Sequence, residues 1–258
     1  YRAWRWEQAA GLLFQQNINQ ASNARQFIRN YQSMNAWAYS MMAWGSRTWG
    51  QHEWALRYDQ VDFNAYYRPP GSGINDPVIR DARNFQRWSA AWTWLWSIPG
   101  TSWQIRLNAG SGWRPPSAHE LYANGLHQGM AALEQGNPSL IPEQTRMINL
   151  GLEWKGKDLE FYSQIGQRSI RDYIFLEPMA TSAIIINGVY PQFAFVGRDA
   201  NLSHWNNRLH QHLGKDWKLS LATAWVRGRD QEQQEWLIWM PADRWSFGLH
   251  HDAPESKE

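Results

Sequence analysis

The sequence contains no cysteine, and this absence excludes several kinds of site. A chain of 258 residues without a thiol cannot form disulfides, bind metals through thiolates or use a cysteine nucleophile. No run of 18 uninterrupted apolar residues is present either, so no membrane-spanning helix is predicted. The chain also lacks a large excess of positive or negative charge, because it has 25 Lys and Arg and 23 Asp and Glu. A net charge of +2 gives no basis for binding nucleic acid through its phosphates.

The motifs of the common enzyme classes are missing too. The sequence has no Gly-x-Ser-x-Gly, no P-loop and no glycine-rich dinucleotide turn. Acidic residues occur in pairs, but no pattern ties a pair to a cleft. The chain is therefore predicted not to be an enzyme and to carry no cofactor.

Tryptophan, by contrast, is abundant. The chain has 19 of them, and aromatic residues make up 15% of the sequence. A soluble core seldom needs so many, because each buried indole N–H requires a hydrogen-bond partner. Tryptophan is enriched at membrane interfaces, on carbohydrate-binding faces and at protein interfaces, and composition alone does not choose among these.

Alternation of apolar and polar residues predicts β-strands. Trp103, Ile105 and Leu107 alternate with Gln104 and Arg106, which is the two-residue period of a strand. The same period recurs along the chain. Strands are predicted at four segments expected to be consecutive in one antiparallel sheet: 101–111, 145–155, 159–175 and 217–227.

The connections between these segments alternate in length. Short turns are predicted around Pro99, Gly156 and Gly214. Between them lie long polar segments, at about 15–34, 64–86, 112–144, 176–194 and 228–238. Short turns at one rim and long loops at the other are typical of an all-β, antiparallel up-and-down transmembrane β-barrel. We count about ten strands in five pairs and no domain boundary, so residues 1–258 are treated as one β-barrel region.

The tryptophans favour a lipid-facing orientation of the apolar strand faces, because a closed small barrel could not pack so many indoles inside. Several of them lie close to the short turns, where an aromatic girdle is expected. Six are predicted to point away from the barrel lumen: Trp92, Trp94, Trp96, Trp103, Trp154 and Trp217.

One segment carries a specific resemblance. It begins Gly112-Trp113-Arg114-Pro115-Pro116, reaches Glu120-Leu121, and continues Gly136-Asn137-Pro138-Ser139-Leu140-Ile141-Pro142-Glu143 before a strand that contains Gly151-Leu152-Glu153. This order resembles the signature of TonB-dependent outer-membrane receptors, which have an aromatic-Arg-x-Pro loop, a Glu-Leu pair and then Gly-Asn-Pro-x-Leu-x-Pro-Glu. The resemblance covers about Leu12 to Lys257.

The resemblance implies a function and a location. The protein is expected in the outer membrane of a Gram-negative bacterium, taking up a scarce nutrient such as a metal ion, haem or a siderophore. Its implied partners are the lipid bilayer, the small nutrient ligand, a surface lipoprotein and the TonB complex at the inner membrane, reached through the plug region. Nucleic acid is not an expected partner.

The sequence also departs from the family pattern. A full receptor has a plug domain and 22 strands, whereas this chain shows about ten strands and no plug, so the plug and part of the barrel are expected to be absent. The N-terminus lacks a signal-peptide pattern, which fits a removed leader or an internal piece of a longer chain. The stretch 206–212 is polar on both predicted faces, which does not suit a lipid-facing strand.

The long 112–144 segment is expected on the extracellular side, where it contributes to ligand capture, because binding residues concentrate on loops held by a rigid scaffold. Its imidazole and carboxylate groups suit a borderline metal or haem. The candidate ligand-binding residues are Arg114, His119, Glu120, Tyr122 and His127, with His119 and His127 as candidate metal ligands. His210 and His212 form a second, weaker pair on one strand face. A loop that only closes the barrel mouth is the alternative.

Two other functions remain open from the sequence. The first is a passive pore or structural outer-membrane barrel, which a plug and a TonB-contacting segment in the parent protein would distinguish from a transporter. The second is a soluble, Trp-rich glycan-binding β protein, which would not need detergent for solubility.

Overall fold

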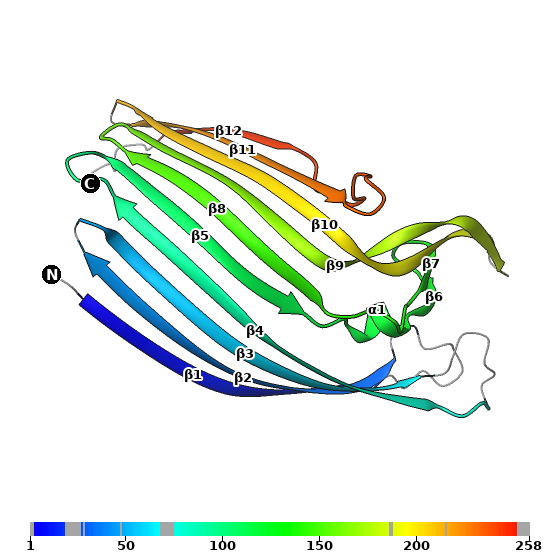
Figure 1. Cartoon of the computed structure of the whole chain (residues 1–258). Helices are drawn as coiled ribbons and strands as arrows, with labels where there is room; N and C mark the ends of the chain where they lie inside the picture. The colour runs from blue at the N-terminus through cyan, green and yellow to red at the C-terminus, as the bar shows by residue number, and fades with distance from the viewer. Residues whose placement is uncertain are drawn as a thin grey trace, which may run out of the picture.

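A computed structural model describes residues 3–18, 27, 29–46, 48–67, 75–185, 188–214 and 216–251. These residues form one large sheet with a single short helix (Figure 1). The first five strands are β1 (Ala3–Asn17), β2 (Asn30–Ser46), β3 (Gly50–Tyr67), β4 (Ile79–Ser97) and β5 (Trp103–Arg114). Helix α1 (Ala118–Tyr122) and the short strands β6 (Asn124–His127) and β7 (Ala132–Gln135) follow. The remaining strands are β8 (Glu143–Lys155), β9 (Leu159–Ile185), β10 (Gly188–Leu213), β11 (Trp217–Asp230) and β12 (Arg244–His251).

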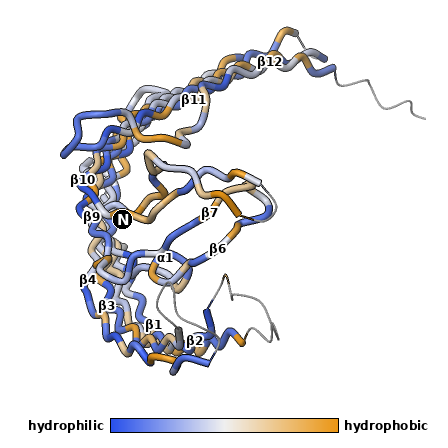
Figure 2. The backbone as a smooth tube through the Cα atoms, turned by 90° about the vertical axis from the view of Figure 1, so that its right-hand side faces the viewer, coloured by the Kyte–Doolittle hydropathy of each residue, from blue (hydrophilic) through white to orange (hydrophobic). Residues whose placement is uncertain are grey.

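The ten long strands form an antiparallel meander. Each pairs with the next in the order β1-β2-β3-β4-β5-β8-β9-β10-β11-β12, while β7 pairs with β6 and adds in parallel to β10. The sheet curves into an open arc, and α1, β6 and β7 lie in its concave side (Figure 2). The predicted all-β, up-and-down barrel architecture with about ten long strands is confirmed. No helix in the described ranges is long and apolar enough to cross a membrane.

Two details of the sequence prediction are wrong. The strands predicted at 159–175 and 217–227 are not neighbours, because β10 lies between β9 and β11. The segment 176–194, expected to be a loop, belongs to the hairpin of β9 and β10, whose pairing reaches Ile185 and Gly188. The pairing continues past Pro191 because a register shift there absorbs the proline.

The register of the ladders defines the two faces of the sheet. On β4, Asp81 accepts a hydrogen bond from the Tyr122 hydroxyl and Arg83 donates one to the Pro138 carbonyl, so odd-numbered residues of β4 face the lumen. Even-numbered residues of β4 therefore face outward, and pairing carries this assignment across the sheet. All six tryptophans predicted to point away from the lumen lie on this outer, convex face: Trp92, Trp94, Trp96, Trp103, Trp154 and Trp217.

Aromatic rings line the short-turn rim of the outer face. Trp94 and Trp96 stack with ring centroids 5.7 Å apart, Trp44 stacks on His52 at 5.5 Å, and Trp103 lies 6.4 Å from Trp154. An aromatic girdle at one edge of an apolar band is what a membrane interface selects, since an indole has an apolar body and a polar N–H.

The stretch 206–212, polar on both faces, lies within β10. Asn206, Arg208 and His210 face the lumen, where charge is acceptable. Asn207 faces outward, but its side-chain amide donates to the Thr223 hydroxyl of β11 at 3.0 Å. This cross-strand hydrogen bond gives the Asn207 amide a partner within the outer face, and the Gln211 amide donates to the His212 carbonyl, so the sequence pattern is compatible with a membrane-spanning strand.

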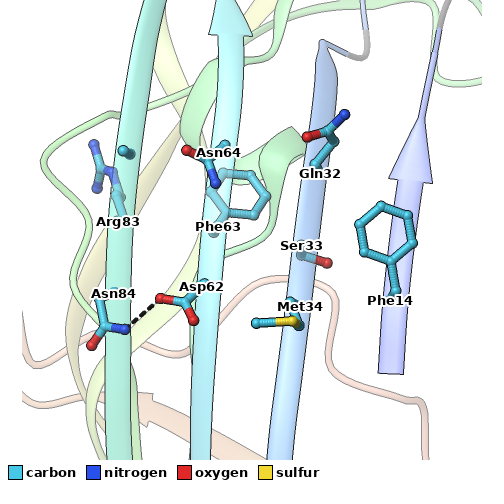
Figure 3. Close-up of a pocket in the computed structure, with 10 residues that line it drawn as sticks. Phe14, Gln32, Ser33, Met34, Asp62, Phe63, Asn64, Arg83 and Asn84 are labelled. Carbon is cyan, nitrogen blue, oxygen red and sulfur yellow. Dashed lines mark hydrogen bonds between the residues drawn. The ribbon is translucent and has the colours of Figure 1, made fainter. Parts of the chain in front are cut away.

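On β1 to β4 the outer face changes from apolar to polar towards the long-loop rim. A groove of about 410 Å³ lies at this change, between Phe14 and Met34 on one side and Asp62 and Asn84 on the other (Figure 3). The Asn84 amide donates to the Asp62 carboxylate at 2.5 Å. The polar residues Asp62 and Asn84 mark where the apolar band ends on the long-loop side of these strands. None of the five predicted ligand-binding residues lines the groove.

Candidate ligand-binding site

The segment after β5 turns into the concave side of the arc through helix α1. The helix starts at a capping box, in which the Ser117 hydroxyl accepts from the Glu120 N–H and the Glu120 carboxylate accepts from the Ser117 N–H. The signal for this helix is present in the sequence as Ser-x-x-Glu, but sequence reasoning treated the whole segment as loop. Three of the five candidate residues, His119, Glu120 and Tyr122, are placed by this single turn.

Arg114 forms ion pairs with both Glu120 and Glu143. Arg114 forms a bidentate ion pair with Glu143, at 2.9 and 3.0 Å, and also reaches the Glu120 carboxylate at 2.8 Å. The other role of Glu143 is to accept the Ile174 backbone N–H at 2.7 Å. This network joins the ends of β5, β8 and β9 to α1. Its geometry indicates that Arg114 and Glu120 shape the site, and their contact with a ligand stays a prediction.

The surroundings of Glu120 stabilise its ionised form. Burial alone would raise the pKa of this carboxyl, but hydrogen bonds from Arg114 and Ser117 outweigh burial and lower it below the ordinary 4.5. The stabilisation that Glu120 contributes is therefore complete above pH 4.5 and is lost as the pH falls through the lowered value of the folded state.

Tyr122 anchors the inner face of α1. It is 4% exposed, and its hydroxyl donates a hydrogen bond to Asp81. Burial, reinforced by this bond to a carboxylate, raises the pKa of the phenol. The helix also shares a hydrophobic core with residues from both halves of the arc: Phe63 and Ala65 of β3, Ile174 of β9 and Phe195 of β10. Tyr122 is thus a packing residue, and a direct ligand contact by it remains a prediction.

The two candidate histidines meet at a buried carboxylate. His127 Nδ1 hydrogen-bonds Glu134 Oε1 at 2.5 Å, and His119 Nε2 lies 2.8 Å from Glu134 Oε2. Glu134 belongs to β7 and its side chain is only 1% exposed, whereas the two imidazoles are partly exposed. The His119 contact has the length of an ion pair but not the angle of a hydrogen bond, so Oε2 of Glu134 is left without a hydrogen-bond donor. The structure therefore brings His119 and His127 together, as the metal hypothesis requires.

Aromatic rings surround this pair. The Phe27 ring lies 4.9 Å from the His119 ring and 5.2 Å from the His127 ring, and Phe195 meets His119 edge-on at 5.2 Å. Sequence reasoning missed Glu134, Phe27 and Phe195. Only Glu134 carried a signal, as an acid in the same segment as the histidines.

The two imidazole–carboxylate distances in this cluster, 2.5 Å for His127 and 2.8 Å for His119, are too short for two ligands of one metal ion. Two ligands of one tetrahedral metal, each bonded at about 2.0–2.1 Å, lie about 3.3 Å apart, which is longer than either imidazole–carboxylate contact. Within the described part of the chain, no group of three or more His, Asp or Glu is arranged to hold a metal ion. A metal bound by His119 and His127 would thus require the Glu134 carboxylate to move.

Gly136 lies in close contact with the backbone at the end of α1, so its substitution tests how much this contact stabilises the fold. Its N–H donates to the Ala123 carbonyl at 2.7 Å, and a Cβ there would lie 2.5 Å from the backbone nitrogens of Tyr122 and Ala123. We expect Gly136→Ala to lower the free energy of unfolding by about 1–3 kcal/mol, because backbone must shift to admit the methyl group. Denaturant unfolding of the full-length protein in detergent measures this change.

Gly112→Ala is the matched control, since a Cβ at Gly112 would meet no atom within 4 Å. Its effect on stability should be close to zero. Equal losses in the two variants would show that the contact between Gly136 and α1 is not what makes the first substitution costly.

The sequence matches the family described as TonB dependent receptor-like, beta-barrel, over residues 4–251. No curated protein matches it. Among solved structures, the copper transporter OprC is 17% identical with a TM-score of 0.71, over 87% of this chain and 34% of that one.

Two further structures share the fold. A double mutant of the Serratia marcescens hemophore receptor HasR, in complex with its hemophore HasA and heme, is 15% identical with a TM-score of 0.76, over 98% of this chain and 47% of that one. The ferric-catecholate import receptor Fiu from E. coli K12 is 12% identical with a TM-score of 0.55, over 88% and 33%. The chain thus spans about a third to a half of these receptors. Because the family match covers nearly its whole length, the chain belongs to the TonB-dependent receptor β-barrel family.

Proposed function

We propose that the full-length protein is an outer-membrane receptor that takes up a scarce nutrient, a metal ion, haem, a siderophore or a similar molecule, with energy delivered through TonB. The family assignment supports uptake as the general role and an outer-membrane location in a Gram-negative bacterium. It also argues against an enzyme and against the soluble glycan-binding alternative, because the tryptophan-rich face is the outer face of a barrel. A surface lipoprotein stays a predicted partner.

The observation that carries the ligand proposal is the meeting of His119 and His127 at Glu134. Two imidazoles and a buried carboxylate are donor types that suit a borderline metal or the iron of haem, and binding would require the Glu134 carboxylate to move away from the imidazoles. The elements that carry these residues, α1, β6 and β7, lie on the concave side of the arc (Figure 2) and at the long-loop end of the sheet (Figure 1). A ligand arriving from outside would meet them before the deeper lumen. The partly exposed rings of His119 and His127 are the accessible members.

Binding measurements on the full-length receptor test this proposal. We expect the double variant His119→Ala, His127→Ala to lose about 10-fold or more in affinity for one of zinc, copper or haem. The control is His210→Ala, His212→Ala, which removes two imidazoles from the lumen face of β10 and should leave affinity unchanged. Unchanged affinity of the first variant for all three ligands would remove the metal and haem versions, while the family assignment would stand.

Uptake distinguishes the receptor from a passive pore. Cells that express the full-length protein should accumulate the ligand only when TonB is functional. Uptake that is equal with and without TonB would favour the passive pore.

A further inference from the structure

Within the part of the chain that the structure describes, two arginines on the lumen face of β10 to β12 form no ion pair or side-chain hydrogen bond. They are Arg208 of β10 and Arg244 of β12, and both are exposed. On β3, by contrast, the lumen-facing Arg57 donates to the Asp59 carboxylate at 2.6 and 2.7 Å. A guanidinium without a carboxylate partner offers its five N–H donors to an anion from outside the protein.

Carboxylates close to these arginines have other cations beside them. Asp243, the residue before Arg244, accepts two hydrogen bonds from Arg227, at 2.6 and 2.8 Å. Glu160 lies directly opposite Lys155 across the ladder of β8 and β9. Both carboxylates thus have a basic neighbour of their own, and the positive charge of the two arginines is not balanced within the described ranges.

The two arginines line one pocket. Its volume of about 720 Å³ lies in the range of about 300–1,000 Å³ found for small-molecule sites, and most of its lining residues face the lumen. Arg208 is paired with Ala222 of β11, and Arg244 is paired with Ala224 of the same strand. Alanine side chains are short, so these two form a floor over which both guanidinium groups can reach the same molecule.

Neutral hydrogen-bond donors complete the lining of the pocket. The Tyr162 hydroxyl donates to Gln164 Oε1 at 2.7 Å, so the amide N–H groups of Gln164 remain available to a ligand. Asn206 and Ser246 add a second amide and a hydroxyl. A carboxylate accepts hydrogen bonds at both of its oxygens, and it binds most strongly where a charged donor and neutral donors lie together.

We propose that this pocket binds a small solute that carries two or more carboxylates, with one carboxylate held by Arg208 and another by Arg244. The two strands that carry these arginines are separated by β11 (Figure 1), which places them about 10 Å apart, and two carboxylates of one molecule span this distance better than a single ion does. Each guanidinium holds a carboxylate through paired N–H donors. The inference goes beyond the uptake proposed above and does not rest on it, because the pocket shares no residue with the histidine site.

Isothermal titration calorimetry of the full-length receptor in detergent, with citrate as the probe, tests the proposal. Wild type should bind citrate but not its neutral ester triethyl citrate, and acetate, with one carboxylate, should bind about 10-fold or more weakly than citrate. These comparisons need no variant. The double variant Arg208→Gln, Arg244→Gln should bind citrate about 10-fold or more weakly than wild type. Ala224→Phe, which fills the floor of the pocket without changing charge, should also weaken binding.

The matched control is Arg168→Gln. Arg168 is exposed on the lumen face of β9 but does not line the pocket, so its loss should leave citrate binding unchanged. Four results would overturn the proposal: no binding of citrate by wild type, equal binding of citrate and its ester, unchanged affinity in the double variant, or displacement of citrate by an equal concentration of inorganic phosphate. The last would indicate a site for single anions. None of these results bears on the uptake proposal, which is tested by accumulation that depends on TonB.

Discussion

Glu143→Ala is expected to destabilise the folded receptor by about 2–4 kcal/mol, mostly through the lost acceptor of a buried N–H, because Arg114 is 44% exposed and solvent screens its charge. The substitution removes a carboxylate that is 10% exposed, leaves Arg114 with only Glu120, and leaves the buried Ile174 N–H without its acceptor. Both losses act at the point where β5, β8 and β9 meet α1. Guanidinium unfolding of the full-length receptor in micelles measures the total effect, and hydrogen exchange at the Ile174 amide reports the local one.

Glu153→Ala on the same strand is the control. Glu153 pairs with Lys155, which is 65% exposed, so removing this solvent-screened pair should change stability far less than Glu143→Ala does. If the two variants lose the same stability, the network around Glu143 would be no more than a surface ion pair.

Leu56→Arg should destabilise the membrane-inserted barrel by about 2–4 kcal/mol. Leu56 lies in the middle of the outer apolar run of β3, between Trp54 and Tyr58, where a guanidinium would lie in hydrocarbon. Reversible unfolding from lipid vesicles measures this cost, which should fall when the same substitution is made nearer to either rim.

Met41→Arg tests whether the loss of stability depends on the face of the sheet that carries the arginine and not on the added charge alone. Met41 lies on the neighbouring strand but faces the lumen, directly opposite Glu7 of β1. An arginine there has a carboxylate partner and water, so little stability should be lost. Equal costs at Leu56 and Met41 would contradict the assignment of the convex face to lipid.

The sequence predicts strands and faces well because both follow from local periodicity. Trp103, Ile105 and Leu107 alternate with polar residues, and the structure places all three on the outer face of β5. The hairpin of β9 and β10 was missed because Pro178, Pro191 and the small residues between them suggest a loop. Cross-strand pairing overrides that local preference, and a two-residue period cannot report pairing partners.

The candidate site was predicted only in part, for a similar reason. Sequence proximity within one segment was enough to group His119 with His127. The partners that define the site are remote or come from other elements: Asp81 is 41 residues from Tyr122, and Ile174 is 31 residues from Glu143. The Tyr122 contact depends on α1 folding into the concave side of the sheet, and the Glu143 contact depends on β8 lying beside β9. Periodicity along strands specifies neither.

Helix α1 links the histidine pair to the shape of the barrel wall. One side of its single turn presents His119, and the other side holds β3, β4, β9 and β10 through Leu121 and Tyr122. Because α1 contacts these strands, a molecule that binds His119 more tightly in one position of α1 also favours one curvature of the arc. By thermodynamic reciprocity, a force that bends the arc changes affinity at His119 by the same factor. The helix is therefore the element through which strain in the barrel and occupancy of the site would be exchanged.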